Sequence, residues 1–198
     1  MINVSCNGAN DGSATATITL GGSTPYTYSW SQGAQTSSTA TGLLPGFHTV
    51  IITDSNGCIT TKTVSITEPT IFTATATAAN ILCSGGTATA TVTAAGGTTA
   101  YTYLWSQGNQ TTQTATGLLA GSHTVVLNDA NNCTIIKTVT IAQPIPLTAT
   151  ATATNILCNG GTTTATVTAG GGIPGYIYLW ASGSQSTQIA TGLVAGNQ

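Results

Sequence analysis

The stretch Tyr101-Thr102-Tyr103-Leu104-Trp105 shows how this sequence is organised, because its pattern occurs three times at a fixed interval. The Tyr-x-Tyr-x-Trp signature starts at Tyr26, Tyr101 and Tyr176. Other residues repeat with the same step, namely Trp30, Trp105 and Trp180; Gly42, Gly117 and Gly192; His48 and His123; Asp54 and Asp129; and Pro69 and Pro144. A constant step of about 75 residues is typical of a tandem array of small domains.

Outside the signature, the second copy consists of short strand-like segments. Thr alternates with apolar residues in 72–78 and in 87–94, which predicts strands with one apolar face and one hydroxyl-bearing face. Further strands are predicted at 101–105, 111–116, 123–127 and 134–141. Each copy is expected to have seven short strands, and these six segments are the ones that can be located. Their spacing of about ten residues, with no helical periodicity, predicts an all-β fold in which each copy is a β-sandwich.

Proline marks the expected boundaries between copies, because it ends strand pairing and stiffens a short connection. Pro69 and Pro144 are each followed within three residues by a new strand-like run. We therefore expect three modules arranged end to end, at residues 1–69, 70–144 and 145–198. The first lacks its opening strand and the third lacks its closing strands, so we interpret the sequence as a window from a longer polypeptide.

Charged residues make up only 3% of the chain, compared with roughly 25% in ordinary soluble domains. They are Asp11, Asp54, Glu68, Asp129, Lys62 and Lys137, and the net charge is -2. Without a basic face, the chain is not expected to bind nucleic acid. No segment approaches the ~20 apolar residues of a membrane-spanning helix, so membrane insertion is not expected either.

The five cysteines occupy two positions of the repeat. Cys6, Cys83 and Cys158 open the three copies, and Cys58 and Cys133 close the first two. We predict the disulfides Cys6–Cys58 and Cys83–Cys133, each inside one module; buried free thiols are the alternative. Each bond would close a loop of about 50 residues, worth roughly 4 kcal/mol in the chain-entropy model. Paired cysteines in a small Thr-rich domain fit an oxidising, extracellular compartment.

The aromatic residues of the signature have two readings. We predict that Trp30, Trp105 and Trp180 fill the centre of each sandwich beside the disulfide, as a strand tryptophan does in immunoglobulin-type domains. The alternative is a platform on which the tryptophans and tyrosines stack against sugars.

No catalytic, cofactor-binding or metal-binding residues are predicted. His48 and Asp54 are six residues apart on one strand, as are His123 and Asp129. Side chains with this spacing lie about 20 Å apart, too far for a catalytic hydrogen bond. Asp54 and Asp129 could contribute to a calcium site, but Ca²⁺ takes six to eight oxygen ligands, so we expect Asx-type turns.

The first copy carries a further series of motifs: Cys6-Asn7-Gly8, Gly21-Gly22, Pro25-Tyr26, Trp30, Gly42-Leu43, Gly46 and Asp54-Ser55-Asn56-Gly57-Cys58. Together they resemble the SprB repeat, a module of giant cell-surface adhesins in gliding bacteria that use the type IX secretion route. The resemblance covers all three copies, although His48 and His123 stand where the family usually has Tyr. It implies an Ig-like or PKD-like sandwich, secretion, and a stalk or adhesive role.

We therefore expect a non-catalytic extracellular segment of a cell-surface adhesin, stalk or fibre that acts by structural extension and multivalent attachment. Its expected partners are further copies of itself, through head-to-tail or lateral assembly, or surface glycans. Because both ends of the sequence fall inside a sandwich, completion by a neighbouring strand is one route to assembly. The alternative function is that of a carbohydrate-binding accessory module in a secreted multidomain protein.

Overall fold

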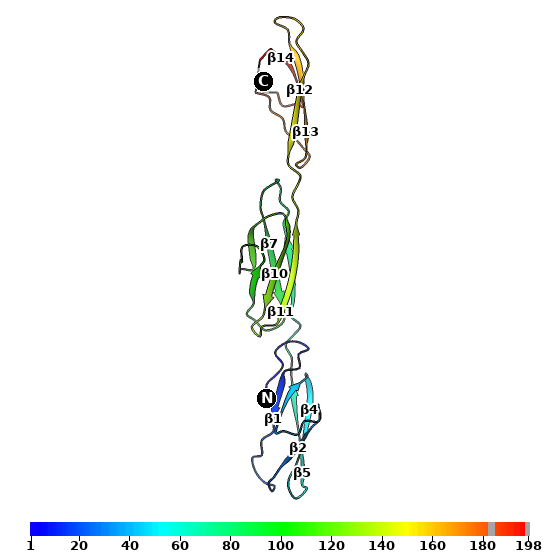
Figure 1. The fold of residues 1–198 in the computed structure, drawn as a ribbon, viewed down its shortest axis with the longest axis vertical. Helices are drawn as coiled ribbons and strands as arrows, with labels where there is room; N and C mark the ends of the chain where they lie inside the picture. The colour runs from blue at the N-terminus through cyan, green and yellow to red at the C-terminus, as the bar shows by residue number, and fades with distance from the viewer. Residues whose placement is uncertain (182–184, 197–198) are drawn as a thin grey trace. The chain divides into compact units, whose positions relative to one another are not determined.

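The computed structural model describes residues 1–181 and 185–196, and every regular element among them is a β-strand (Figure 1). The first repeat contains β1 (Gly12–Thr15), β2 (Thr27–Trp30), β3 (Thr39–Leu43), β4 (Gly46–Thr53) and β5 (Ile59–Ile66). The second contains β6 (Thr73–Ala78), β7 (Ala88–Ala95), β8 (Thr102–Trp105), β9 (Thr114–Leu118), β10 (Gly121–Asn128) and β11 (Thr134–Ile141). The third contains β12 (Thr148–Ala153), β13 (Thr163–Gly170) and β14 (Ile189–Leu193). The predicted all-β fold of repeated sandwich modules is confirmed.

The strands form small antiparallel sheets that recur from repeat to repeat. In the second repeat, one sheet has the order β6-β7-β9 and the other the order β11-β10-β8. The corresponding sheets are β1-β3 and β2-β4-β5 in the first repeat, and β12-β13-β14 in the third. In the first and second repeats, the two sheets are the layers of a sandwich, and the described part of the third repeat contains one sheet.

The expectation of seven strands per module is wrong, because residues 70–144 form six strands. The segment from Gly117 to Gly121 belongs largely to β9 and β10, and only Leu119 and Ala120 lie between these strands. Gly117 continues β9 with a φ of 67°, which glycine adopts without the steric cost that a Cβ would bring. The two-residue connection leaves no room for a seventh strand.

The alternation of Thr with apolar residues sets which face of a strand is buried. In β7, Ala88, Ala90 and Val92 point into the core, while Thr89 and Thr93 are exposed. Successive side chains of a strand point to opposite faces, so this sequence gives one apolar and one polar surface. The small alanines let the two sheets approach closely around the larger core residues.

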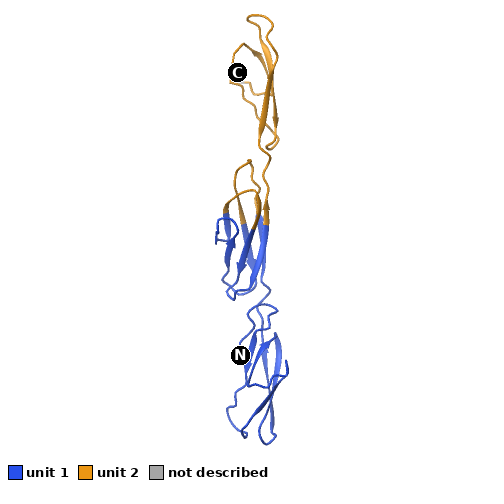
Figure 2. Ribbon diagram, viewed as in Figure 1, with its two compact units in different colours: residues 1–77, 91–115, 124–138 blue, residues 78–90, 116–123, 139–198 orange. Residues whose placement is uncertain are grey.

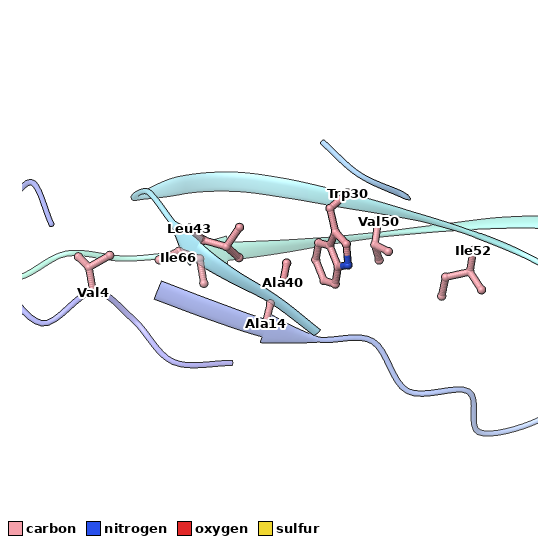
Figure 3. Packing of buried hydrophobic residues seen from close by; sticks show 8 residues of the cluster. All are labelled: Val4, Ala14, Trp30, Ala40, Leu43, Val50, Ile52 and Ile66. Atoms are coloured by element: carbon pink, nitrogen blue, oxygen red, sulfur yellow. The ribbon is translucent and has the colours of Figure 1, made fainter. Parts of the chain in front are cut away.

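The core of the first repeat is a cluster of eight buried side chains, shown in Figure 3. Its members are Val4, Ala14, Trp30, Ala40, Leu43, Val50, Ile52 and Ile66. Trp30 is the largest of them and lies among Ala40 and Val50 in that view. Fully burying one aliphatic side chain contributes about 1.5–3 kcal/mol, so a cluster this small leaves the first repeat with a modest core.

The register of β4 and β5 positions the residues discussed below. The two strands pair along their full length, from Gly46 opposite Ile66 to Thr53 opposite Ile59. The turn at residues 54–58, which contains Asp54 and Cys58, is therefore at one end of the hairpin. The segment that follows Ile66 leaves from the other end.

The chain divides into two compact units, drawn in different colours in Figure 2. Unit 1 comprises residues 1–77, 91–115 and 124–138, and unit 2 comprises residues 78–90, 116–123 and 139–198. The division falls inside β6, β7, β9, β10 and β11. The repeat boundaries at Pro69 and Pro144 stay a prediction, and each unit is described by itself.

Within the described residues, no helix is both long enough and apolar enough to cross a lipid bilayer.

Candidate functional site

Each of the three signature tryptophans makes the same kind of hydrogen bond. The indole Nε1 of each donates to a backbone carbonyl seven residues further on: Trp30 to Ser37 (2.9 Å), Trp105 to Thr112 (3.0 Å) and Trp180 to Thr187 (2.9 Å). Trp30 and Trp105 are 4% and 0% exposed. Trp180 is half-buried against a smaller cluster of Ala165, Ala190 and Leu193. A buried indole whose one donor is satisfied is a core residue, which leaves little of it for a ligand.

The first tyrosine of each signature binds the glycine turn that precedes it. Its hydroxyl donates to a backbone carbonyl five residues earlier: Tyr26 to Gly21 (2.9 Å), Tyr101 to Gly96 (2.7 Å) and Tyr176 to Gly171 (2.6 Å). The Tyr101 ring also stacks on Phe72, with 5.5 Å between the ring centroids. These contacts occupy the hydroxyl and the ring face of Tyr101 that a sugar-binding platform would need.

Asp54 organises the turn between β4 and β5. Its Oδ1 accepts the backbone N–H groups of Asn56 (3.0 Å) and Cys58 (2.8 Å), and its Oδ2 accepts that of Ser23 (3.0 Å). The bond from Ser23, followed by that from Cys58, lowers the pKa of this carboxyl below its ordinary value, because these donors stabilise the charged form. The arrangement is that of an Asx-type turn tied to a neighbouring loop.

Asp129 makes the same turn in the second repeat and is buried. It accepts hydrogen bonds from the backbone N–H groups of Thr98 (2.8 Å), Asn131 (2.9 Å) and Cys133 (2.9 Å). Burial raises the pKa of Asp129, but these three donors together outweigh it, so the net shift is downward.

Asp11, which has no counterpart in the other repeats, accepts the backbone N–H of Ser5 (3.0 Å), and its side-chain interaction with Ser5 lowers its pKa.

The two histidines are buried and bind backbone instead of carboxylates. His48 Nε2 lies 2.8 Å from the carbonyl oxygen of Leu44, and His123 Nε2 lies 2.8 Å from that of Leu119. A carbonyl only accepts, so Nε2 carries the proton in both rings. Each His ties its strand to the turn four residues earlier.

No group of three or more His, Cys, Asp or Glu side chains that could hold a metal ion occurs among residues 1–181 and 185–196. The oxygens of Asp54 and Asp129 receive N–H donors, the geometry of a turn rather than of a cation site.

The predicted cysteine pairing is wrong. Cys6 is bonded to Cys133, 127 residues away in the sequence, with 5.8 Å between the Cα atoms. Cys58, Cys83 and Cys158 are free thiols and are exposed, which also contradicts the alternative of buried thiols. The bond lies within unit 1 and joins the opening cysteine of the first repeat to the closing cysteine of the second. It is therefore a link between repeats rather than inside one.

The length of β5 explains why Cys6 does not pair with Cys58. The opening turn is bound to the end of its own repeat, because Gly8 N–H donates to Glu68 Oε2 (2.8 Å) and Asn7 Nδ2 to the carbonyl of Pro69 (3.1 Å). The eight residues of β5 (Ile59–Ile66) separate that end from Cys58, a span of roughly 26 Å at about 3.3 Å per residue. A disulfide requires Cα atoms within about 7 Å, so Cys6 and Cys58 cannot meet. The cluster around Trp30 contains no cysteine either, so the tryptophan does not pack beside the disulfide.

Asn131 adds a polar contact to the link between repeats. Its Nδ2 donates to the carbonyl of Ser5, next to the disulfide, at 2.8 Å, and to Thr98 Oγ1 at 3.1 Å. Asn56 and Asn131 occupy equivalent positions of the repeat, which is a signal for such a role. The sequence does not show that the contact crosses to another repeat.

A glutamine was also missed by the sequence reasoning. Gln35 closes the loop after β2, because its Oε1 accepts the N–H of Thr41 and its Nε2 donates to the carbonyl of Thr41, both at 2.9 Å. Gln185 binds Thr191 in the same way, at 2.9 Å for each bond. The available signal was the recurrence of glutamine at equivalent positions of the three copies, Gln35, Gln110 and Gln185.

Comparison with known families gives one match. A sequence model of the SprB repeat matches residues 2–35, 75–110 and 150–185, which together are more than half of the chain. Each match runs from the opening segment of a repeat through the Tyr-x-Tyr-x-Trp signature. No curated protein matches the chain. The matched module is a structural repeat and not the signature of an enzyme family.

Proposed function

The chain belongs to the SprB repeat family, and we propose that it is a non-catalytic, secreted segment of a cell-surface adhesin, stalk or fibre. The observation that supports this proposal is the disulfide between consecutive repeats. Cys6 and Cys133 join two copies of one sandwich where a flexible linker would otherwise suffice. A covalent link between copies suits a segment that has to keep its span under load.

The proposed mechanism has two parts: the repeats extend the segment, and repeated weak contacts attach it to a surface. Short connections at Pro69 and Pro144 hold the repeats in sequence, and the disulfide limits their separation. Attachment then comes from many equivalent weak contacts, one set per repeat, whose effects combine as avidity. The proposed partners are further copies of the chain, in head-to-tail or lateral assembly, or surface glycans.

The exposed surface is compatible with weak, repeated contacts. Threonines form the outer face of β7, and Phe47 on β4 is 81% exposed. Such a surface has little charge to hold a single high-affinity ionic ligand. The location that follows is extracellular, where a disulfide persists.

The test uses beads that carry the intact chain at graded densities, exposed to bacterial cell surfaces and to immobilised glycans under flow. We expect retention that rises more steeply than linearly with density and that is lost when soluble chain is added in excess. Equal retention of beads coated with an unrelated β-sandwich of the same charge would contradict the adhesive part. Electron microscopy at high concentration tests self-assembly separately, since only single particles would contradict it.

A further inference from the structure

We propose that Cys83 is one half of a second inter-repeat disulfide, equivalent to Cys6–Cys133, and that its partner is the closing cysteine of the repeat that follows it. Cys58 is the opposite half of the same kind of link. This inference does not depend on what the array binds. It rests on three features of the described residues: the opening turns, the closing turns and a hollow beside Cys83.

The opening turns of the three repeats have the same geometry. In each, a backbone N–H three residues further on donates to the carbonyl of the opening cysteine at 3.0 Å: Ala9 to Cys6, Gly86 to Cys83 and Gly161 to Cys158. Gly8, Gly85 and Gly160 have φ values of 75°, 80° and 77°. Gly85 N–H donates to Gln143 Oε1 (3.0 Å), as Gly8 N–H does to Glu68. Cys83 is therefore presented at the end of its repeat in the way that Cys6 is.

The two closing turns also match. In both, the Asp N–H donates to the carbonyl of the closing cysteine, at 3.0 Å for Asp54–Cys58 and 3.1 Å for Asp129–Cys133. The residue before each cysteine has a positive φ, 81° for Gly57 and 64° for Asn132. Asn56 Nδ2 donates to Ser23 Oγ (3.0 Å), as Asn131 does to Thr98. The bonded and the free closing cysteine are thus held by the same turn.

Inside unit 2, a hollow of about 650 Å³ lies beside Cys83. Leu82, Leu147, Ile173 and Ile177 line it together with Cys83. Ile173 occupies the position in the third repeat that Thr98 occupies in the second, and the Thr98 backbone binds Asp129 and Ala130 of the closing turn next to Cys6. The hollow thus places the opening cysteine Cys83 beside Ile173, the residue equivalent to the one that binds the closing turn in the second repeat. An Asp-x-Asn-x-Cys turn, of the kind that residues 129–133 form, is the occupant that this arrangement fits.

The chemistry of the link is a two-electron oxidation. Two thiols lose two protons and two electrons to form one S–S bond, and a disulfide-bearing oxidant such as oxidised glutathione is reduced to two thiols. The thiolate is the attacking species, and Cys83 is exposed and accessible to the oxidant.

The experiment uses residues 1–196 followed by a copy of residues 122–143, which replaces Asn197 and Gln198. Gly196 is the counterpart of Gly121 in the repeat, so the third copy gains the closing hairpin of the second, including a copy of Cys133. The protein is oxidised with glutathione, free thiols are alkylated, and the disulfides are mapped by peptide mass spectrometry. We expect Cys83 bonded to the added cysteine, with Cys58 and Cys158 alkylated. In the matched control the added cysteine is serine, and we expect Cys83 to be alkylated as well.

Two outcomes would overturn the proposal. One is a bond between the added cysteine and Cys158 of its own repeat. The other is an alkylated Cys83 in extended protein whose Cys6–Cys133 bond has formed. A non-reducing gel decides the source of the partner, because a Cys83 bond between two chains gives a dimer and contradicts the assignment to the next repeat.

A second arm needs no extension, in case the added hairpin does not fold. A peptide covering residues 126–136, with Cys133 activated as its glutathione mixed disulfide, is offered to the intact chain. We expect at least a tenfold faster exchange at Cys83 than at Cys58, because only an opening turn is complementary to a closing turn. Equal rates at the two thiols would contradict the proposal.

Discussion

The two opening cysteines Cys6 and Cys83 sit in the same turn but in different states. At Cys6, inside unit 1, the closing turn of the next repeat supplies both the disulfide and the bond from Asn131 to Ser5. At Cys83, inside unit 2, the thiol is free and borders a hollow lined by apolar side chains. Leu82, which stands next to Cys83 as Ser5 stands next to Cys6, is 74% exposed. Both opening turns are therefore held by contacts within their own repeats, and at Cys6 the disulfide is completed by the next repeat.

Removal of the link at Cys6 has the largest expected effect on this comparison. In Cys133→Ser, the loop of 127 residues is no longer closed, and the chain-entropy model gives a loss of about 5 kcal/mol for unfolding of the linked repeats. Denaturant unfolding monitored by Trp fluorescence measures the loss, with Cys58→Ser as the matched control. An unchanged unfolding midpoint would show that the bond does not couple the repeats.

Core substitutions compare the second repeat with the third. Trp105→Ala is expected to cost about 3–5 kcal/mol, because a buried aromatic side chain leaves a cavity. Trp180→Ala is expected to cost less than half as much, since this ring is half-buried and packs on three buried side chains within the described residues. Thermal unfolding followed by circular dichroism measures both variants. Equal losses would mean that the third repeat is as well packed as the second.

The turns of Asp129 and Asp54 hold a bonded and a free closing cysteine, respectively, and can be compared by substituting each aspartate. The pKa of Asp129 is lower in the folded chain than in the unfolded chain, so its stabilisation is present above about pH 4 and is lost as the pH falls through the folded value. Asp129→Asn is expected to cost about 1–3 kcal/mol at pH 7 and to flatten the loss of stability in acid. Urea unfolding at pH 7 and pH 3 measures this, with Asp54→Asn as the half-buried counterpart. The same pH dependence in wild type and Asp129→Asn would refute the assignment.

The smallest effect is expected at the free opening cysteine. Cys83 is exposed and unbonded, so Cys83→Ser should change the stability of the isolated chain by less than about 0.5 kcal/mol. The same unfolding assay measures it alongside Cys6→Ser, which removes the link. A large loss in Cys83→Ser would mean that the two opening turns differ in more than their partner.

Much of the fold could be predicted from local pattern. The Thr–Ala alternation of 72–78 and 87–94 placed β6 and β7 to within a residue or two, because side-chain direction in a strand follows sequence position. Weaker segments were placed less well: 111–116 was predicted where β9 covers Thr114–Leu118. The strand begins later than predicted because the loop after β8 extends past Gln110. The carbonyl of Gln110 accepts the N–H of Trp105 at 2.9 Å within this loop.

The site residues divide in the same way. The Asx turn at Asp54 is local, since its carboxylate reaches residues two and four positions away, and the sequence could predict it. The bonds from Ser23 and Thr98 to the two aspartates, and from Asn131 to Ser5, join distant segments and could not be predicted from spacing.

The sequence by itself determined the repeat length, the all-β class, the buried face of β7 and the cysteine positions, because each of these follows from periodicity and local chemistry. Only the tertiary structure decided which cysteines meet. The reason is geometric: an eight-residue strand keeps the opening and closing cysteines of one repeat too far apart for a bond, so the partner has to come from the neighbouring repeat.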